Sequence, residues 1–226
     1  MARRSGSTAS DLLRDPGVLE PSPTLEVFGS AACAITNGIS VLPLRTDWIR
    51  AREARIEAMP SWEDVADDGF TQAVVHLQKG RAATWQGLGE AWRRLEVGGR
   101  LLLVGGNELG IKSAVKRLTG ELEQPAEILS NRARSRIACW RREGPLEPAH
   151  PEISPVEVVA GQDRFGLRSA AGVFSADGVD PGTRLLLDHL SELDPPHRIF
   201  DPGCGLGVLG LAALRRWPEA TAVLAD

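Results

Sequence analysis

The stretch Ile199-Phe200-Asp201-Pro202-Gly203-Cys204-Gly205-Leu206-Gly207-Val208-Leu209-Gly210 decides the fold class of this chain. A short apolar run ends in a carboxylate, glycines follow at alternate positions, and the apolar segment 211–214 continues at helix-compatible spacing. This pattern predicts a strand, a tight loop and a helix, which together open a Rossmann-like α/β unit. Residues 221–225 predict the next strand, and Asp226 follows it.

The preceding sequence alternates between apolar runs and amphipathic segments. Continuous apolar runs such as 101–104 are typical of strands in a parallel sheet that is covered on both faces. Tryptophans and leucines recur at three- and four-residue spacing over 81–95, which predicts an amphipathic helix. The order of elements therefore predicts an α/β fold. We expect strands at 72–77, 101–104, 137–140, 156–159 and 163–168, helices over 45–58, 81–95, 111–122 and 183–193, and a turn at 97–100.

A proline-rich segment divides the chain. Residues 144–151 contain three prolines, a composition that marks a linker. We expect an N-terminal tail over 1–24, a first domain over 25–143, a linker over 144–155 and a second domain over 156–226.

Composition narrows the class of protein. The chain has 226 residues and a formal net charge of −4, so no overall basic charge indicates a nucleic-acid partner. No apolar run reaches the ~20 residues of a membrane helix, and no signal-peptide core is present. The three cysteines are far apart, which favours a reducing, cytoplasmic location. The four histidines suggest no metal site, because they form no cluster with ligand spacing (His76, His150, His189 and His197).

The glycine pattern at 205–210 fits the dinucleotide motif G-x-G-x-x-G, but a lone match is weak evidence. Asp201 discriminates between ligands. A carboxylate before the loop would face the pyrophosphate of a dinucleotide, whereas S-adenosylmethionine offers an ammonium and a sulfonium. We therefore predict that Asp201 accepts from the ammonium, that the loop glycines allow close backbone approach, and that Asp226 accepts from both ribose hydroxyls. The cofactor-side loop residues are Gly203, Cys204, Gly205 and Gly207.

Two plainer interpretations compete with this site. The loop could be a glycine-rich turn without a ligand, although two carboxylates at the expected places make that the minority case. Cys204 could be a nucleophile, but the sequence places no histidine to activate it. A loop residue without a chemical role is the better interpretation.

With these residues, the chain resembles a known family. The segments 172–175, 177–183, 185–187 and 201–210, in this order, look like the small-domain class I methyltransferases, and most like the bacterial 16S ribosomal RNA guanine-N2 methyltransferases. The resemblance extends from about residue 156 to Asp226. It implies that the cofactor is S-adenosylmethionine and that Phe174 and Ser175 lie over it. It also implies that the partner is 16S-type ribosomal RNA or the small ribosomal subunit.

The first half is similar to the N-terminal half of such enzymes, a degenerate methyltransferase domain. Its segment 91–104 resembles the late helix, turn and strand of a class I methyltransferase, yet no Asp-x-Gly-x-Gly-x-Gly loop precedes it. The resemblance implies two Rossmann-like domains in tandem, the first degenerate and the second incomplete. The first half would then position RNA or support the second. Its arginine run fits either phosphate contact or a solvated sheet edge (Arg132, Arg134, Arg136, Arg141 and Arg142).

The family's Asn-Pro-Pro-Phe motif, which orients the guanine amino group, does not occur in this sequence. We therefore assign no catalytic residue, and we expect the chain to be a piece of such an enzyme that does not transfer methyl groups by itself. Two alternatives stay open. The chain could be a non-catalytic RNA-binding or scaffold protein derived from a methyltransferase, or, less favoured, an NAD(P)-binding oxidoreductase. The oligomeric state is not predicted.

Overall fold

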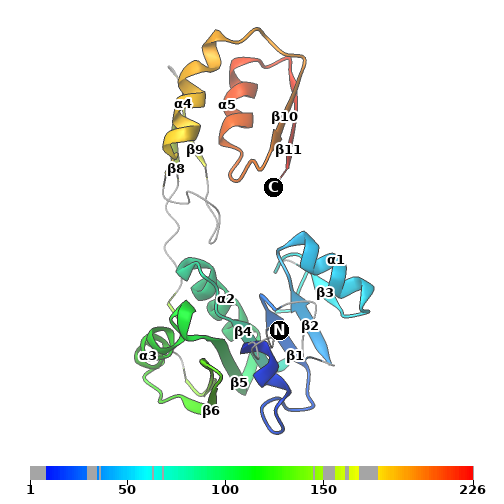
Figure 1. Ribbon diagram of the computed structural model, residues 1–226, viewed down its shortest axis with the longest axis vertical. Coiled ribbons are helices and arrows are strands. Elements are labelled where there is room, and N and C mark those ends of the chain that lie inside the picture. Colours follow the sequence, from blue (N-terminus) through cyan, green and yellow to red (C-terminus); the bar gives the residue numbers. More distant parts are fainter. Residues whose placement is uncertain are drawn as a thin grey trace, which may run out of the picture. The chain divides into compact units, whose positions relative to one another are not determined.

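The computed structural model describes residues 9–29, 35, 37–62, 64–67, 69–144, 146–149, 156–160, 163–167 and 178–225. The chain divides into two compact units, Met1–His150 and Pro151–Asp226. Figure 1 labels the elements of each unit.

The first unit is built on a seven-stranded sheet with the strand order β3-β2-β1-β4-β5-β7-β6. The strands are parallel except β7, which runs antiparallel to both neighbours. The mixed sheet confirms the prediction of a Rossmann-like α/β fold. In chain order the elements are η1 (Ala9–Arg14), β1 (Thr24–Val27), β2 (Gly38–Val41), α1 (Arg45–Glu53), β3 (Ala58–Met59), β4 (Phe70–His76), α2 (Arg81–Arg94), β5 (Leu95–Gly106), η2 (Asn107–Leu109), α3 (Ile111–Leu122), β6 (Glu127–Arg132) and β7 (Ser135–Arg141).

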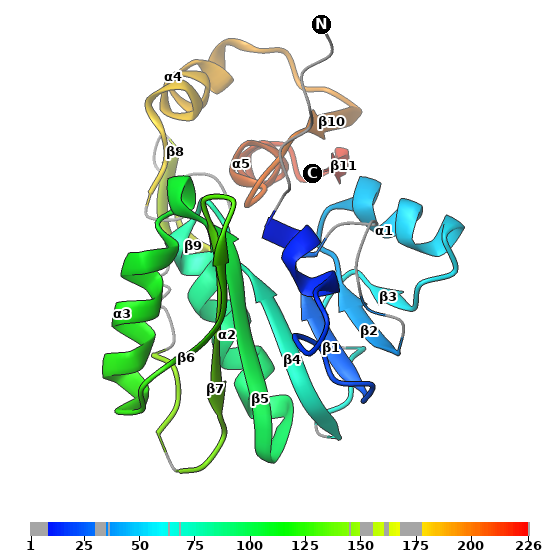
Figure 2. The same cartoon turned by 60° about the horizontal axis from the view of Figure 1, so that its bottom comes forward.

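The two faces of this sheet are covered differently, as Figure 2 shows. One face packs against α2 and α3 through a large apolar cluster that includes Trp85, Leu88 and Leu118. The opposite face is covered by η1, whose Leu12 and Leu13 join a second apolar cluster on β4, β5 and β7. Because successive side chains of a strand point to opposite faces, both clusters draw on the same strands.

Residues 9–24 are thus part of the fold rather than the tail expected from their composition. Leu12 is fully buried, and Ser10 Oγ lies 3.4 Å from His76 Nδ1. Glu20 of the same segment accepts a hydrogen bond from Arg100 of β5, with its Oε1 at 2.8 Å. Buried polar groups on this face of the sheet require partners, and the N-terminal segment supplies them.

Several boundaries differ from the sequence prediction. The turn expected at 97–100 lies within β5, where Gly98 has a φ of +84° and its N–H donates to the Arg142 carbonyl at 2.8 Å. The strands β1 and β2 were not predicted, because each has only four residues. The polar strand β6 was also not predicted. Its own residues show no strand pattern, and its pairing with β7 in the hairpin determines it.

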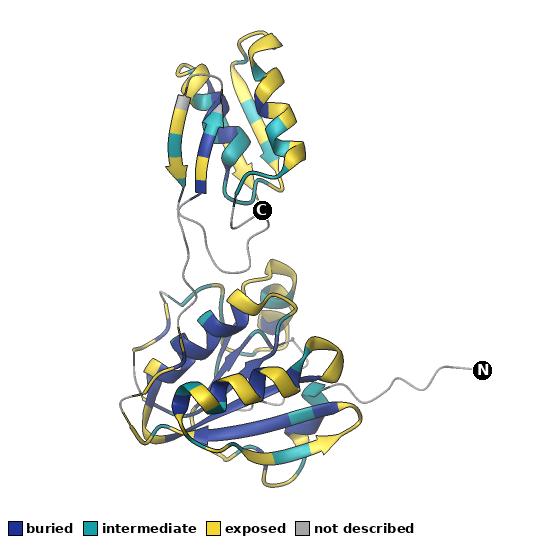
Figure 3. Cartoon of the chain, turned by 90° about the vertical axis from the view of Figure 1, so that its left-hand side faces the viewer, coloured by how far each residue is buried: buried dark blue, intermediate teal, exposed yellow. Residues whose placement is uncertain are grey.

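The second unit contains the hairpin β8 (Val156–Ala160) and β9 (Asp163–Leu167), then α4 (Pro181–His189), η3 (Leu190–Glu192), β10 (Arg198–Pro202), α5 (Val208–Arg216) and β11 (Thr221–Ala225). β10 and β11 form a parallel pair. The apolar core is small, with Val156, Val158, Leu187 and Ala212 as its buried residues. Exposed positions are frequent on β10 and β11 (Figure 3), where Phe200 is 68% exposed. Among the described helices of both units, none combines the length and the hydropathy of a membrane span.

Candidate cofactor site

The glycine loop turns the chain from β10 into α5. Gly203, Gly205 and Gly207 all have positive φ angles, of +73°, +53° and +77°. This left-handed region is costly for residues with a Cβ atom and open to glycine. The backbone geometry therefore explains why glycine recurs at alternate positions, as the motif predicted.

Gly210 has a different role, because it lets α5 pack closely on β11. A Cβ atom built on Gly210 would lie 2.0 Å from Leu224 Cδ2. The third glycine of a G-x-G-x-x-G motif commonly serves such helix–strand packing.

The loop is also held against the end of β11. The backbone N–H groups of Gly203 and Cys204 both donate to the Ala225 carbonyl, at 2.6 and 3.0 Å. Asp226 directly follows in the chain, but it lies outside the described residues. Its predicted contact with ribose hydroxyls stays a prediction.

The Asp201 side chain is held between β10 and α5. It lies near the end of β10, and its Oδ2 accepts from the Gly210 N–H in the first turn of α5 at 3.1 Å. Within the described part of the chain, Oδ1 makes no hydrogen bond. One oxygen of the carboxylate therefore fixes the side chain, and the other can accept from a ligand.

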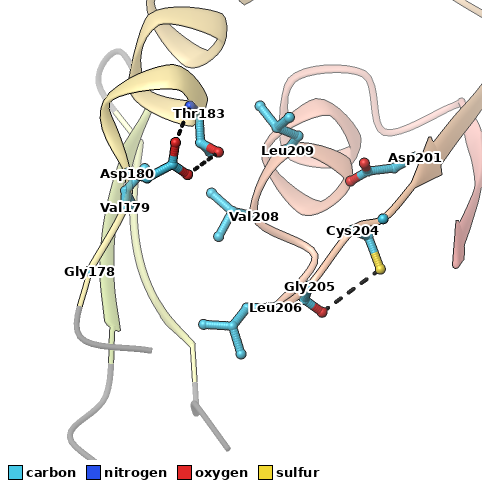
Figure 4. Close-up of a pocket in the computed structure, with 11 residues that line it drawn as sticks. Gly178, Val179, Asp180, Thr183, Asp201, Cys204, Gly205, Leu206, Val208 and Leu209 are labelled. Carbon is cyan, nitrogen blue, oxygen red and sulfur yellow. Dashed lines mark hydrogen bonds between the residues drawn. The ribbon is translucent and has the colours of Figure 1, made fainter. Parts of the chain in front are cut away.

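A cavity of about 290 Å³ lies beside this carboxylate, close to the lower limit of about 300 Å³ for ligand pockets. Figure 4 shows that its lining comes from the glycine loop with the start of α5 on one side and from the start of α4 on the other. The lining residues are Gly178, Val179, Asp180, Thr183, Asp201, Gly203, Cys204, Gly205, Leu206, Val208 and Leu209. The structure thus brings four of the predicted residues together at one cavity: Asp201, Gly203, Cys204 and Gly205.

Sequence reasoning did not single out Asp180 and Thr183 as site residues. Asp180 is the N-cap of α4 and accepts from the N–H groups of Gly182 and Thr183. The Thr183 hydroxyl also donates to Asp180 Oδ2 at 2.6 Å, and this hydrogen bond is the main cause that lowers the pKa of Asp180. The sequence signal was present, since an aspartate before a proline is typical of a helix start.

Of the remaining predicted residues, Gly207 is the N-cap of α5 and does not line the cavity. Phe174 and Ser175 lie outside the described residues, so the structure says nothing of their position.

The two described cysteines differ in their surroundings. The Sγ atom of Cys204 lies 3.8 Å from the Gly205 carbonyl. Burial raises the pKa of Cys139, which disfavours its reactive thiolate form. No group of three potential metal ligands occurs among the residues that the structure describes.

Three arginines of the run in the first unit are engaged by other groups of the chain. Arg132 pairs with Asp15, and Arg142 donates to the carbonyls of Arg93 and Leu95. Arg141 donates to the Gly98 carbonyl. These contacts favour a structural role for these three arginines, of which Arg132 lies on the edge strand β6.

The sequence is similar to known proteins. Residues 164–226 match the family model described as methyltransferase small domain. The chain is 37% identical over 172 residues to ribosomal RNA small subunit methyltransferase C of Pseudomonas putida (strain W619), covering 72% of this chain and 49% of the relative. It is 33% identical over 179 residues to the protein of the same name in Pseudomonas aeruginosa (strain LESB58), covering 77% and 52%. The chain spans about half the length of these curated relatives.

Among solved structures, the chain matches the T. thermophilus 16S rRNA N2 G1207 methyltransferase, determined in complex with AdoMet and guanosine. The TM-score is 0.77 at 24% identity, and the match covers 96% of this chain and 62% of the other. The fold is therefore that of the Rossmann-like methyltransferases. Residues 164–226 match the model of the methyltransferase small-domain family, as the resemblance in the sequence predicted.

Proposed function

We propose that this chain is part of a cytoplasmic, S-adenosylmethionine-dependent ribosomal RNA guanine-N2 methyltransferase, and that its second unit holds the cofactor. The observation that carries the proposal is the cavity at the glycine loop, where Asp201 is fixed by the Gly210 N–H. The likeness to the small-subunit methyltransferases supports the substrate class.

The residues present fit the methyl donor. The available Asp201 oxygen matches the ammonium of the methionine end, whereas a pyrophosphate at this place would bring like charges together. The positive-φ glycines lack side chains that would keep a ligand from the backbone. Asp226 would accept from the ribose hydroxyls, and Phe174 and Ser175 would lie over the cofactor.

The first unit resembles a methyltransferase domain without a cofactor site. Its β1 and β2 form a parallel pair like β10 and β11. The connection 28–37 is, however, too short in sequence for a glycine loop followed by a nine-residue helix such as α5. In our proposal this unit contributes to RNA binding and to the support of the second unit.

We assign no residue of this chain to the orientation of the guanine amino group. Because the Asn-Pro-Pro-Phe motif does not occur in the sequence, we expect cofactor binding without methyl transfer by this chain alone. The cofactor supplies the methyl group when bound, and this chain's residues hold and orient it.

Isothermal titration calorimetry tests the cofactor assignment. S-adenosylhomocysteine should bind with one site per chain, and NAD⁺ should not compete. Asp201→Asn keeps an acceptor for the Gly210 N–H but removes the charge, and should weaken binding about tenfold or more. Asp188→Asn, on the exposed side of α4, is the matched control and should bind like the wild type. Tight NAD⁺ binding, or equal affinity of the Asp201 variant, contradicts the proposal.

A further inference from the structure

A second cavity lies in the first unit, between the start of α2 and the start of α3. Its volume is about 350 Å³, and it lies where the chain leaves β4 and β5. Residues from both connections and both helices line it, including Lys79, Arg81, Ser113 and Arg117. None of its described lining residues is acidic.

Two cations of this cavity have no partner among the residues that the structure describes. Lys79 and Arg81 are exposed, and neither makes a hydrogen bond or an ion pair with any residue that the structure describes. They differ in this respect from Arg132, Arg141 and Arg142 of the arginine run, whose guanidinium groups are bound within the chain. Their charges are therefore available to a ligand.

A third cation is held in a fixed orientation on the other side. The Arg117 guanidinium lies 4.0 Å from the centre of the Trp85 ring, and its Nε donates to Glu121 Oε1 at 2.6 Å. The Trp85 indole N–H donates to the same carboxylate at 3.0 and 2.9 Å. Stacking on Trp85 and the ion pair with Glu121 keep Arg117 at the cavity and limit its rotamer freedom. The same carboxylate offsets the charge of Arg117, so Lys79 and Arg81 supply the unpaired positive charge of the cavity.

The two helix starts add to the positive field. Neither α2 nor α3 has an acidic residue in its first turn, and neither N-cap has a side-chain hydrogen bond. Acidic side chains stabilise helix N-termini, whereas Arg81 and Lys112 place cations there, which is unfavourable without a counter-charge. An anion in the cavity would accept from N–H groups of these first turns and offset the charge of Arg81, which lines the cavity.

We infer that this cavity binds a backbone phosphate of the RNA substrate, an inference that rests on the proposed function. A phosphodiester is the anion that such an enzyme would meet repeatedly along its substrate, and positively charged sites bind it without regard to sequence. The Trp85 ring is only 4% exposed, so it orients Arg117 rather than stacking on a base. The site positions RNA and does not select the guanine.

Fluorescence anisotropy of a labelled, guanine-containing RNA hairpin with the full chain tests the inference. Lys79→Gln/Arg81→Gln should weaken RNA binding about tenfold. It should also reduce the slope of log K against log salt by about 0.7 to 0.9 for each lost phosphate contact. Arg45→Gln/Arg50→Gln on α1 removes the same charge from exposed positions and should change binding far less.

The thermal midpoint separates binding from folding. Because Lys79 and Arg81 have no partners in the described chain, their substitution should leave the midpoint unchanged or raise it. A lowered midpoint, or equal RNA binding by both double variants, overturns the inference.

The source of the phosphate is tested by competition with inorganic phosphate and AMP at matched ionic strength. Strong competition by either would assign the cavity to a free phosphate and overturn the RNA assignment. S-adenosylhomocysteine binding by the same samples keeps the two proposals distinct. If Lys79→Gln/Arg81→Gln binds cofactor and RNA normally, only the assignment of the cavity as a phosphate site is contradicted. If the wild type binds no RNA, the proposed RNA substrate is contradicted as well.

Discussion

The two units begin their parallel sheets in the same way and then diverge. β1 and β10 each carry a carboxylate one residue before the strand ends, Glu26 and Asp201, and each strand pairs in parallel with the next strand of its unit. Residues 28–37 connect the first pair, and residues 203–220 connect the second. The longer connection holds the glycine loop and α5.

The two carboxylates have opposite environments. Glu26 is fully buried; its Oε1 lies 2.8 Å from His76 Nε2, and its Oε2 accepts from the Ser40 hydroxyl at 2.9 Å. A Cβ atom on Gly29 would lie 2.3 Å from the Glu26 carboxyl carbon. Asp201 instead lines a cavity with one oxygen available. In our proposal, Asp201 can accept from a ligand because a cavity lies beside it, whereas the Glu26 carboxylate is engaged by His76 and Ser40.

The largest effect is expected from breaking the buried network of the first unit. Glu26→Ala leaves His76 and Ser40 without their partner in a buried setting, and should lower the free energy of unfolding by about 3 kcal/mol. Urea denaturation followed by tryptophan fluorescence measures this loss, since Trp85, Trp92 and Trp140 belong to this core. Cofactor affinity should not change under folding conditions. A normal stability of the variant would show that the network is not needed.

A somewhat smaller effect is expected at the packing of α5 on β11. Gly210→Val places side-chain atoms where Leu224 lies, and overpacking of this kind costs about 1–3 kcal/mol. The loop and Asp201 should move with α5, so S-adenosylhomocysteine binding should be lost. Gly166→Val on β9 is the control, because a Cβ atom there meets no atom within 4 Å and Gly166 does not line the cavity. Equal binding of S-adenosylhomocysteine by both variants would show that the packing of α5 on β11 does not affect cofactor binding.

The difference in core size predicts a difference in local stability. β4 and β5 are buried along most of their length, whereas β10 and β11 expose Phe200 and Val223. Amide hydrogen exchange should therefore be slow in β4 and β5 and much faster in β10 and β11. S-adenosylhomocysteine should slow exchange in the second unit alone. Uniform protection in both units would contradict the comparison.

The smallest effect concerns the pH dependence of the second unit. The pKa of Asp180 is lowered in the folded state, mainly by the Thr183 hydroxyl. Its contribution to stability is therefore present above its usual pKa and is lost as the pH falls through the lowered value. Thermal midpoints of the wild type and Asp180→Ala should differ at neutral pH and converge in acid. Asp188→Ala should follow the wild type throughout.

Much of the fold could be predicted from local patterns. The helix over 111–122 and the strand–loop–helix at 199–214 follow from apolar periodicity and from the glycine spacing. The strands β1 and β2 could not be predicted, because four residues are too few to show a period. The strand β6 could not be predicted, because its pairing with β7 rather than its own pattern determines it.

The site was predicted in part for the same reason. Asp201 and the glycines are contiguous in the sequence, so their spacing carries the signal. The contribution of Asp180 comes from tertiary packing, since α4 and α5 meet only in the folded unit. The burial of Leu12 likewise depends on a sheet face that no local pattern reveals.

The central claim is that the second unit binds the cofactor through Asp201, whereas the carboxylate of the first unit is structural. The stoichiometry of S-adenosylhomocysteine binding, measured by calorimetry on the wild type, Asp201→Asn and Glu26→Gln, tests it most directly. We predict one site per chain in the wild type and in Glu26→Gln, and an affinity at least about tenfold lower in Asp201→Asn. Two sites per chain, or a loss of binding in Glu26→Gln but not in Asp201→Asn, would contradict the account.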